Sequence, residues 1–124
     1  MSERAAGLLI EDICEAIEKI GRYVAGMTRE TFLSDEKTSD AVARNLEIIG
    51  EAANRLPENI KTKYPDIPWR KITGLRHRIV HEYFDVDLEI VWKIVRDDLP
   101  AFKALLWPVR AELARRNPDR PKTC

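Results

Sequence analysis

The 124-residue chain is long enough for one domain, and its 21 Lys and Arg residues balance 21 Asp and Glu residues, for a formal net charge of zero. Zero net charge disfavours a protein that coats nucleic acid through bulk charge, and no apolar run approaches the ~18 residues that would span a bilayer. With no basic start and no small-residue cleavage site, we expect a cytoplasmic protein without a membrane segment.

Apolar residues recur at three- and four-residue steps over residues 3–24, which predicts an amphipathic helix that Gly26 ends. Residues 28–33 have the length of one short turn. A second long helix is predicted to run to Leu56, where Pro57 stops it because proline has no amide hydrogen.

The second half of the chain predicts further helices. Residues 58–64 form a turn or two, and Pro68 stands where a new helix over residues 69–83 begins. Asp87 then caps a last long helix, in which Pro100 predicts a kink or a restart.

These elements define the fold class. No alternating apolar pattern, hairpin signal or internal repeat is present. We therefore expect an all-α fold, an antiparallel bundle of four to five helices, with residues 1–116 as a single domain and residues 117–124 as a polar tail that frays.

A basic run crosses the middle of this neutral chain, with Asp66 as its only acid. Its cations are Lys61, Lys63, Arg70, Lys71, Arg76 and Arg78. Such a run predicts sequence-independent attraction to an RNA backbone, for which we assign Lys61, Lys63, Arg70 and Lys71. The alternative is a solvated helix face that happens to be basic.

The polar side chains concentrate in residues 68–86, PWRKITGLRHRIVHEYFDV, which contain the pattern Arg76-x4-His81-x-Tyr83. On a helical wheel Arg76 falls inside the apolar sector of the predicted helix over residues 69–83. Because burying a guanidinium is costly, we expect Arg76 to pair with a buried acid, to line a cavity, or to extend along the apolar surface to solvent.

His77 and His81 lie four residues apart, a spacing that can hold zinc on a helix. Arg78 stands between them, no glutamate occupies the position of a general base, and the chain has no third histidine. The two cysteines, Cys14 and Cys124, lack metal-ligand spacing. We therefore expect neither a metal nor another cofactor, and keep a metal hydrolase as a minor alternative.

Acid–base chemistry points instead to His81, whose ordinary pKa is nearest neutrality, with Arg76 stabilising a phosphate. Together they suit cleavage of RNA by internal attack of a ribose 2′-hydroxyl. In a straight helix, however, Arg76 and His81 point about 140° apart. A site that uses both requires the helix to unwind near His81, or a second subunit.

The segments GLRHRIVHEYFDVD, LEIVWKIVRDDLPAF and NLEIIGEAANRLP resemble the HEPN superfamily, and closely the HepT-like toxins. The resemblance implies a helical homodimer with a composite, metal-independent ribonuclease site that includes Arg76, His81 and Tyr83. It also implies a minimal nucleotidyltransferase antitoxin that transfers AMP from ATP to Tyr83. His77 stands where the family often has asparagine or aspartate, so its part in proton transfer stays open.

The resulting hypothesis is the toxin of a toxin–antitoxin pair, a homodimeric ribonuclease with His77 and Arg78 in auxiliary roles. Assembly beyond a dimer stays open. The alternative from a different class is a non-catalytic helical adaptor that binds a nucleotidyltransferase partner or a nucleotide.

Overall fold

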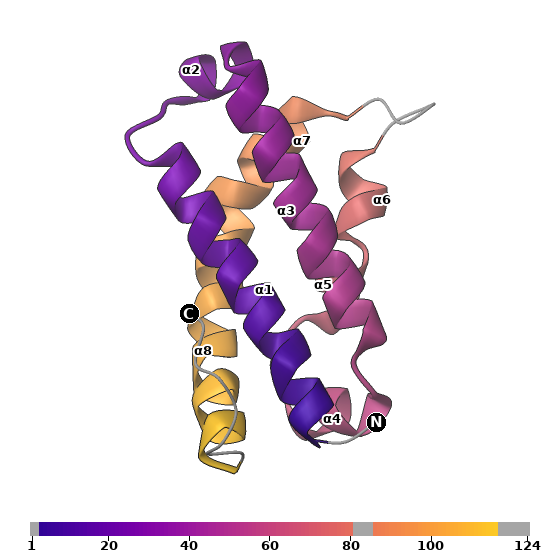
Figure 1. Ribbon diagram of the computed structural model, residues 1–124. Helices are drawn as coiled ribbons and strands as arrows, with labels where there is room; N and C mark the ends of the chain where they lie inside the picture. The colour runs from indigo at the N-terminus through magenta and orange to yellow at the C-terminus, as the bar shows by residue number, and fades with distance from the viewer. Residues whose placement is uncertain (1–2, 81–85, 117–124) are drawn as a thin grey trace.

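Three long helical spans form the body of the molecule. The computed structural model describes residues 3–80 and 86–116. Helix α1 (Glu3–Val24) lies antiparallel to α3 (Glu36–Arg55), and α8 (Leu99–Arg116) packs on α1 and also runs antiparallel to it (Figure 1). Within the described ranges the only strand-like pairing is one isolated β-bridge, so the all-α prediction is confirmed.

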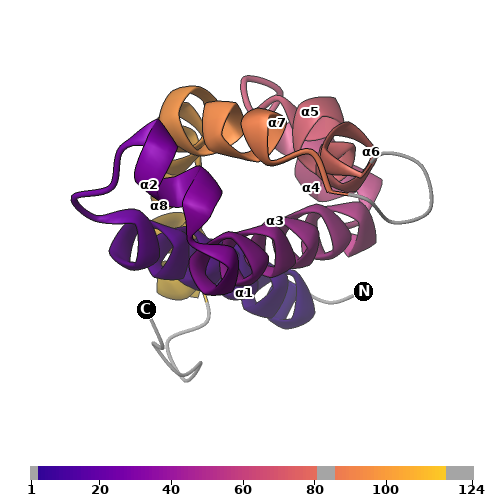
Figure 2. The same cartoon turned by 90° about the horizontal axis from the view of Figure 1, so that it is seen from above.

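Shorter helices complete the fold. Helix α2 (Arg29–Ser34) joins α1 to α3, and α4 (Glu58–Lys63), α5 (Trp69–Thr73) and α6 (Leu75–Ile79) follow α3. Helix α7 (Leu88–Lys93) and the π-helix η2 (Ile94–Asp98) lead directly into α8. Seen from above, α3 has α1 on one side and the segment from α5 to α7 on another (Figure 2).

Several predicted helix ends are confirmed. Gly26 adopts φ 77°, the left-handed conformation that glycine tolerates after a helix. Helix α3 ends at Arg55, immediately before Leu56 and Pro57. At its start the Asp35 side chain accepts hydrogen bonds from the backbone N–H and the hydroxyl of Thr38, which lower the pKa of that carboxyl.

The predicted continuous helix over residues 69–83 is wrong. Helix α5 ends at Thr73, Gly74 separates it from α6, and α6 ends at Ile79. The chain at this break lies close to α3: a Cβ placed on Gly50 would be 3.2 Å from the carbonyl oxygen of Ile72. The absent side chain at Gly50 therefore lets the break between α5 and α6 pack directly against α3.

Pro100 coincides with a restart, as predicted, and the preceding turn is widened. The N–H of Leu99 donates to the carbonyl of Ile94, five residues back, which defines the π-helix. The extra residue in this turn puts Leu99 into the core, where it is 4% exposed. It leaves Asp98 at the side of the continuous helical segment formed by α7, η2 and α8. Asp87 caps α7 through its side chain, as expected.

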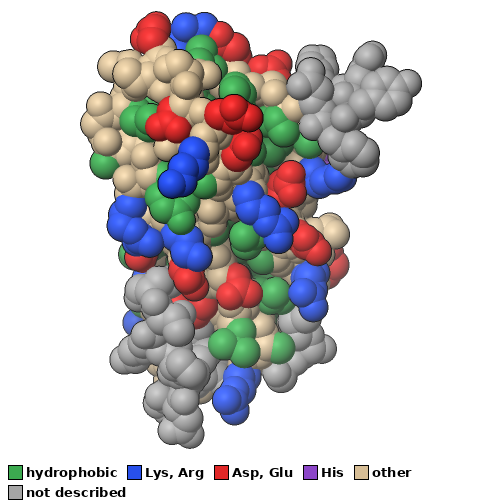
Figure 3. Space-filling model, turned by 45° about the horizontal axis from the view of Figure 1, so that its top comes forward, with side chains coloured by type: hydrophobic (Ala, Val, Ile, Leu, Met, Phe, Trp, Pro, Cys, Tyr) green, Lys and Arg blue, Asp and Glu red, His purple; other side chains and the backbone are tan. Residues whose placement is uncertain are grey.

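A buried ion pair joins the first helix to the last. Arg110 of α8 donates from Nε to Glu11 of α1 at 3.1 Å, and its Nη1 lies 3.6 Å from Glu18. Glu11 is only 4% exposed, and Arg110 also lies over the ring of Trp107. On the outer surface, by contrast, acidic and basic side chains are interspersed across the face drawn in Figure 3.

Among the helices of residues 3–80 and 86–116, none combines the length and the apolar character needed to cross a lipid bilayer.

Arg110→Met is expected to destabilise the fold by about 3 kcal/mol, because it leaves the buried Glu11 carboxylate without the guanidinium that faces it. Urea unfolding measures the loss. Arg44→Met is the control, since Arg44 is exposed and its pair with Glu47 should contribute less than about 1 kcal/mol. Adding Glu11→Leu to Arg110→Met should recover most of the loss. Equal losses for Arg110→Met and Arg44→Met would contradict a special role for the buried pair.

Candidate functional site

Three predicted site residues lie together on α6. Arg76 and His77 are exposed, and Arg78 is half-buried. Leu75 and Ile79 of the same helix are fully buried and fix it against the core. Because α6 has only five residues, its orientation depends on these two side chains rather than on its own helical stability.

The prediction that Arg76 falls in an apolar sector is wrong. The wheel assumed one helix from Ile72 onward, but the break at Gly74 changes the phase of the residues that follow. Arg76 is exposed and makes no ion pair or side-chain hydrogen bond within residues 3–80 and 86–116. Its guanidinium is therefore available to an anionic ligand without the cost of breaking a described pair.

Arg78 has a different environment. Its Nη1 donates to Oδ2 of Asp98 at 2.9 Å, and the two side chains are 34% and 18% exposed. This pair connects α6 to η2, twenty residues further along the chain. It holds α6, the helix that carries Arg76, against η2. Arg78 is therefore a positioning residue in this structure rather than a free cation.

The chain leaves α6 in an extended conformation. Val80 has φ −97° and ψ 123° and forms an antiparallel bridge with Val86, while the N–H of Asp87 donates to the carbonyl of Ile79 at 2.7 Å. The helix thus ends before His81, one of the two arrangements that a shared site for Arg76 and His81 required. His81 and Tyr83 themselves lie outside the described residues.

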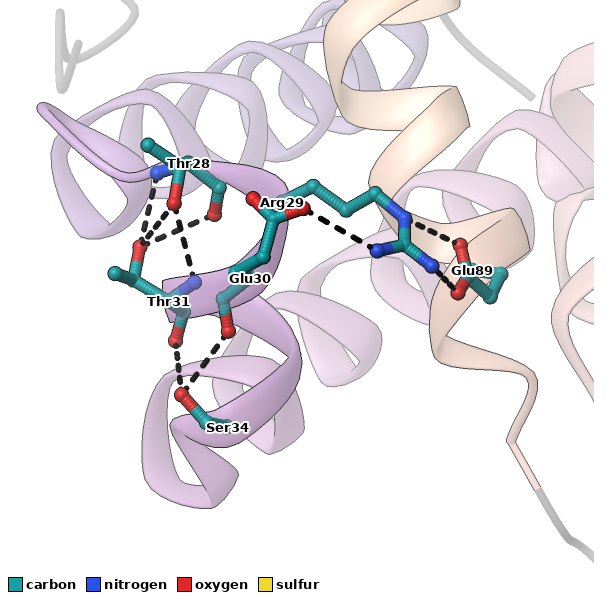
Figure 4. Close-up of polar contacts among 6 residues, drawn as sticks. All are labelled: Thr28, Arg29, Glu30, Thr31, Ser34 and Glu89. Carbon is teal, nitrogen blue, oxygen red and sulfur yellow. Dashed lines mark hydrogen bonds and ion pairs between the residues drawn. The ribbon is translucent and has the colours of Figure 1, made fainter.

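The far side of this bridge is also anchored. Glu89, in the first turn of α7, accepts from Nε of Arg29 at 2.9 Å and from Nη2 of the same guanidinium (Figure 4). These bonds raise the pKa of Arg29. Helices α2 and α7 also meet through the rings of Phe32 and Trp92, whose centroids are 5.2 Å apart. Helix α2 therefore fixes the start of α7 and, through it, the Val86 side of the bridge.

The predicted basic run separates into different surfaces. Lys61 and Arg70 line one hollow of about 380 Å³ between α3, α4 and α5. Lys71 is exposed on α5 and is absent from that hollow. Lys63 lines another hollow, with its Nζ 5.7 Å from the centre of the Tyr64 ring. The structure therefore brings Lys61 and Arg70 together and separates Lys63 from them.

No group of three or more His, Cys, Asp or Glu side chains in the described part of the chain has an arrangement that could hold a metal ion. Cys14 is buried in α1 and is a core residue. The alternative pair of His77 and His81 includes a residue outside the described ranges.

Some residues around the site were not identified from the sequence. Asp98 belongs to no local pattern that marks a site residue, and its contact with Arg78 depends on the widened turn of η2. The hollow that contains Lys61 and Arg70 is lined by residues of α3, α4 and α5, which are separate elements of the chain. The unassigned lining residues are Asn54, Glu58, Thr62, Trp69 and Thr73. No local motif signals this grouping, because helix packing creates it.

Comparison with known proteins gives consistent matches over most of the chain. A family model described as "Ribonuclease HepT-like" matches residues 13–108. A Thermococcus cleftensis protein named "Probable ribonuclease HepT" is 46% identical over 94 residues, covering 76% of this chain and 86% of the relative. A Methanocaldococcus jannaschii protein named as a "Putative RNase" is 40% identical over 100 residues, covering 81% and 83%. No solved structure matches significantly.

Asp98→Asn is expected to loosen α6 by about 1 kcal/mol, because it removes the charge that faces Arg78. Hydrogen exchange should then be about fivefold faster at the amides of Val80 and Asp87, which bond to Arg76 and Ile79. Glu47→Gln, which removes an acid paired with an exposed arginine, is the control and should leave these amides unchanged. Unaltered exchange in Asp98→Asn would show that the pair does not hold α6.

Proposed function

Because this chain belongs to the HepT-like ribonuclease family, we propose that it cleaves RNA with Arg76 and His81 as its catalytic residues. The observation that supports the assignment of Arg76 is its exposure on α6 without a described ion pair, beside the partnered Arg78. Two neighbouring arginines thus differ in availability. The basic side chains before α6 add a sequence-independent attraction to the RNA backbone.

The reaction follows from these residue types. The ribose 2′-oxygen attacks the adjacent phosphorus, the bond from phosphorus to the 5′-oxygen breaks, and a cyclic phosphate and a 5′-hydroxyl result. One proton leaves the 2′-hydroxyl and one reaches the leaving 5′-oxygen. His81 carries out one of these transfers, and a second group or water carries out the other. Arg76 balances the negative charge that develops on the phosphoryl oxygens. His77, exposed beside Arg76, is a candidate to share the proton transfer.

We place the active site at the contact of two copies of the chain. A five-residue helix with exposed Arg76 and His77 offers little enclosure for a strand of RNA. A second copy would supply a facing wall and a second set of motif residues. Toxicity to the host cell is part of the same proposal, since unregulated RNA cleavage stops growth.

Regulation is proposed to act on Tyr83, through a nucleotidyltransferase antitoxin. The phenolic oxygen of Tyr83 attacks the α-phosphorus of ATP, pyrophosphate leaves, and the phenolic proton passes to a base of the transferase or to water. The attached AMP adds a phosphate charge and a bulky base within the Arg76-x4-His81-x-Tyr83 motif. It would compete with RNA for the same cations and so block cleavage.

Purified protein incubated with total RNA in EDTA should cut it, because no step requires a metal ion. His81→Ala and Arg76→Ala should each reduce the rate at least 100-fold, the usual contribution of an acid–base or charge-stabilising group. Lys93→Ala, an exposed cation on α7, is the charge control and should retain activity. Folded parent protein that leaves RNA intact would favour the adaptor function instead. Full activity in folded His81→Ala would refute the assignment of His81.

Protein produced together with its nucleotidyltransferase should carry AMP on the peptide that contains Tyr83, and protein produced alone should not. Mass spectrometry of that peptide reads out the modification directly. Tyr83→Phe should remain unmodified and should cleave RNA whether or not the transferase is present. Tyr23, an exposed tyrosine of α1, serves as the internal control for non-selective transfer. AMP on Tyr23 and Tyr83 alike would argue against a specific regulatory site.

A further inference from the structure

A polar hollow opens between the end of α3, α4 and α5, outside the Arg76-x4-His81-x-Tyr83 motif. Its volume is about 380 Å³. Its lining residues are Asn54, Glu58, Lys61, Thr62, Trp69, Arg70 and Thr73. We call it the α3–α5 hollow.

The cations of this hollow are not engaged with acids. Neither Lys61 nor Arg70 forms an ion pair within residues 3–80 and 86–116, whereas Arg78, Arg110 and Arg29 do. Two cations placed in one hollow repel each other unless an anion separates them. The hollow therefore carries a local positive charge that an anionic ligand would neutralise.

Neutral donors complete the lining. Asn54 and Thr62 are exposed and can donate from an amide and a hydroxyl. The Thr73 hydroxyl instead donates to the carbonyl of Arg70 at 3.3 Å, so its proton is already used within the protein. This mixture of two cations and short polar groups is typical of sites for phosphate oxygens.

Trp69 indicates which part of an RNA strand fits. It is only 9% exposed, and its indole N–H donates to the carbonyl of Tyr64 at 3.1 Å. With its ring buried and its donor used, Trp69 forms the floor of the hollow and offers no open face for a base to stack on. The lining thus favours the sugar–phosphate backbone over a nucleobase.

We propose that the α3–α5 hollow binds an internucleotide phosphate of the RNA, away from the bond that is cut. This inference rests on the proposed function, since it supposes that RNA reaches Arg76. Arg70 and Arg76 are six residues apart, a separation of at most roughly 20 Å for extended chain. One RNA strand several nucleotides long is long enough to span this separation.

The lining of the hollow also includes a carboxylate, which would repel a bound phosphate. Glu58 is exposed at its edge and places a carboxylate near the phosphate. Like charges at this range weaken binding. Removing this carboxylate should strengthen RNA binding, a change that a merely structural role for the hollow would not produce.

The test measures RNA binding separately from cleavage. Labelled single-stranded RNA of mixed sequence is titrated against the full chain carrying His81→Ala, which prevents cutting. Adding Lys61→Gln or Arg70→Gln should weaken binding about three- to tenfold and lower the slope of log K against log salt by about 1. Adding Glu58→Gln should tighten binding about threefold.

Lys93→Gln is the matched control. Lys93 is an exposed cation on α7 and does not line the α3–α5 hollow, so its loss should change the dissociation constant less than twofold. Equal weakening by Lys93→Gln and Lys61→Gln would indicate that diffuse charge attracts the RNA, and it would refute the proposed phosphate site. Thermal melting checks folding, and Glu58→Gln keeps the test decisive if Lys61→Gln unfolds.

The outcomes also separate this proposal from the catalytic one. If the unmodified protein does not cut RNA but Arg70→Gln and Lys61→Gln selectively weaken binding, the phosphate site in the α3–α5 hollow is supported and the ribonuclease proposal for Arg76 and His81 fails. If the unmodified protein cuts RNA in EDTA and both hollow variants bind RNA as tightly as the His81→Ala protein, only the phosphate site is refuted.

Discussion

The site depends on short helices that cannot support themselves. Helices α4, α5 and α6 have six, five and five residues, too few for an isolated helix to be stable in water. They persist because each inserts apolar side chains into the core, and because α3 lets the chain approach closely at Gly50. The surface that carries Arg76 is therefore defined by the packing against α3. Any change that moves α3 moves the candidate site with it.

Arginine serves two purposes in this protein, and pairing with an acid separates them. Arg110 is largely buried and faces Glu11 and Glu18, so its charge is used to join α1 to α8. Arg76 and Arg70 are exposed and have no described acidic partner. Zero net charge conceals this division, because it counts paired and unpaired cations alike. The surface suited to RNA is marked by cations that have no described acidic partner, rather than by the total number of cations.

Local sequence predicted the long helices well, since their ends are set by local chemistry: the left-handed Gly26, the proline after Leu56 and the capping carboxylate of Asp87. It failed between α5 and α6. A glycine within a helical pattern costs only about 1 kcal/mol, so Gly74 alone did not predict a break. The break packs closely against Gly50 of another helix, a contact that the local sequence does not reveal.

The error about Arg76 follows from that missed break, because a helical wheel is valid only while the helix continues. The family was predicted from its motif and confirmed by comparison with known proteins.

The π-helix has a consequence for the whole rod from Leu88 to Arg116. One extra residue in a turn rotates everything after it by about 100° relative to everything before it. Helix α7 can therefore face α2 through Trp92 while α8 faces α1 through Arg110, although the backbone runs on without a loop. The widened turn sets the rotation of α8 about the helix axis relative to α7. One continuous helical rod can therefore pack against two different neighbours, and Asp98, which pairs with Arg78, belongs to the turn that sets this rotation.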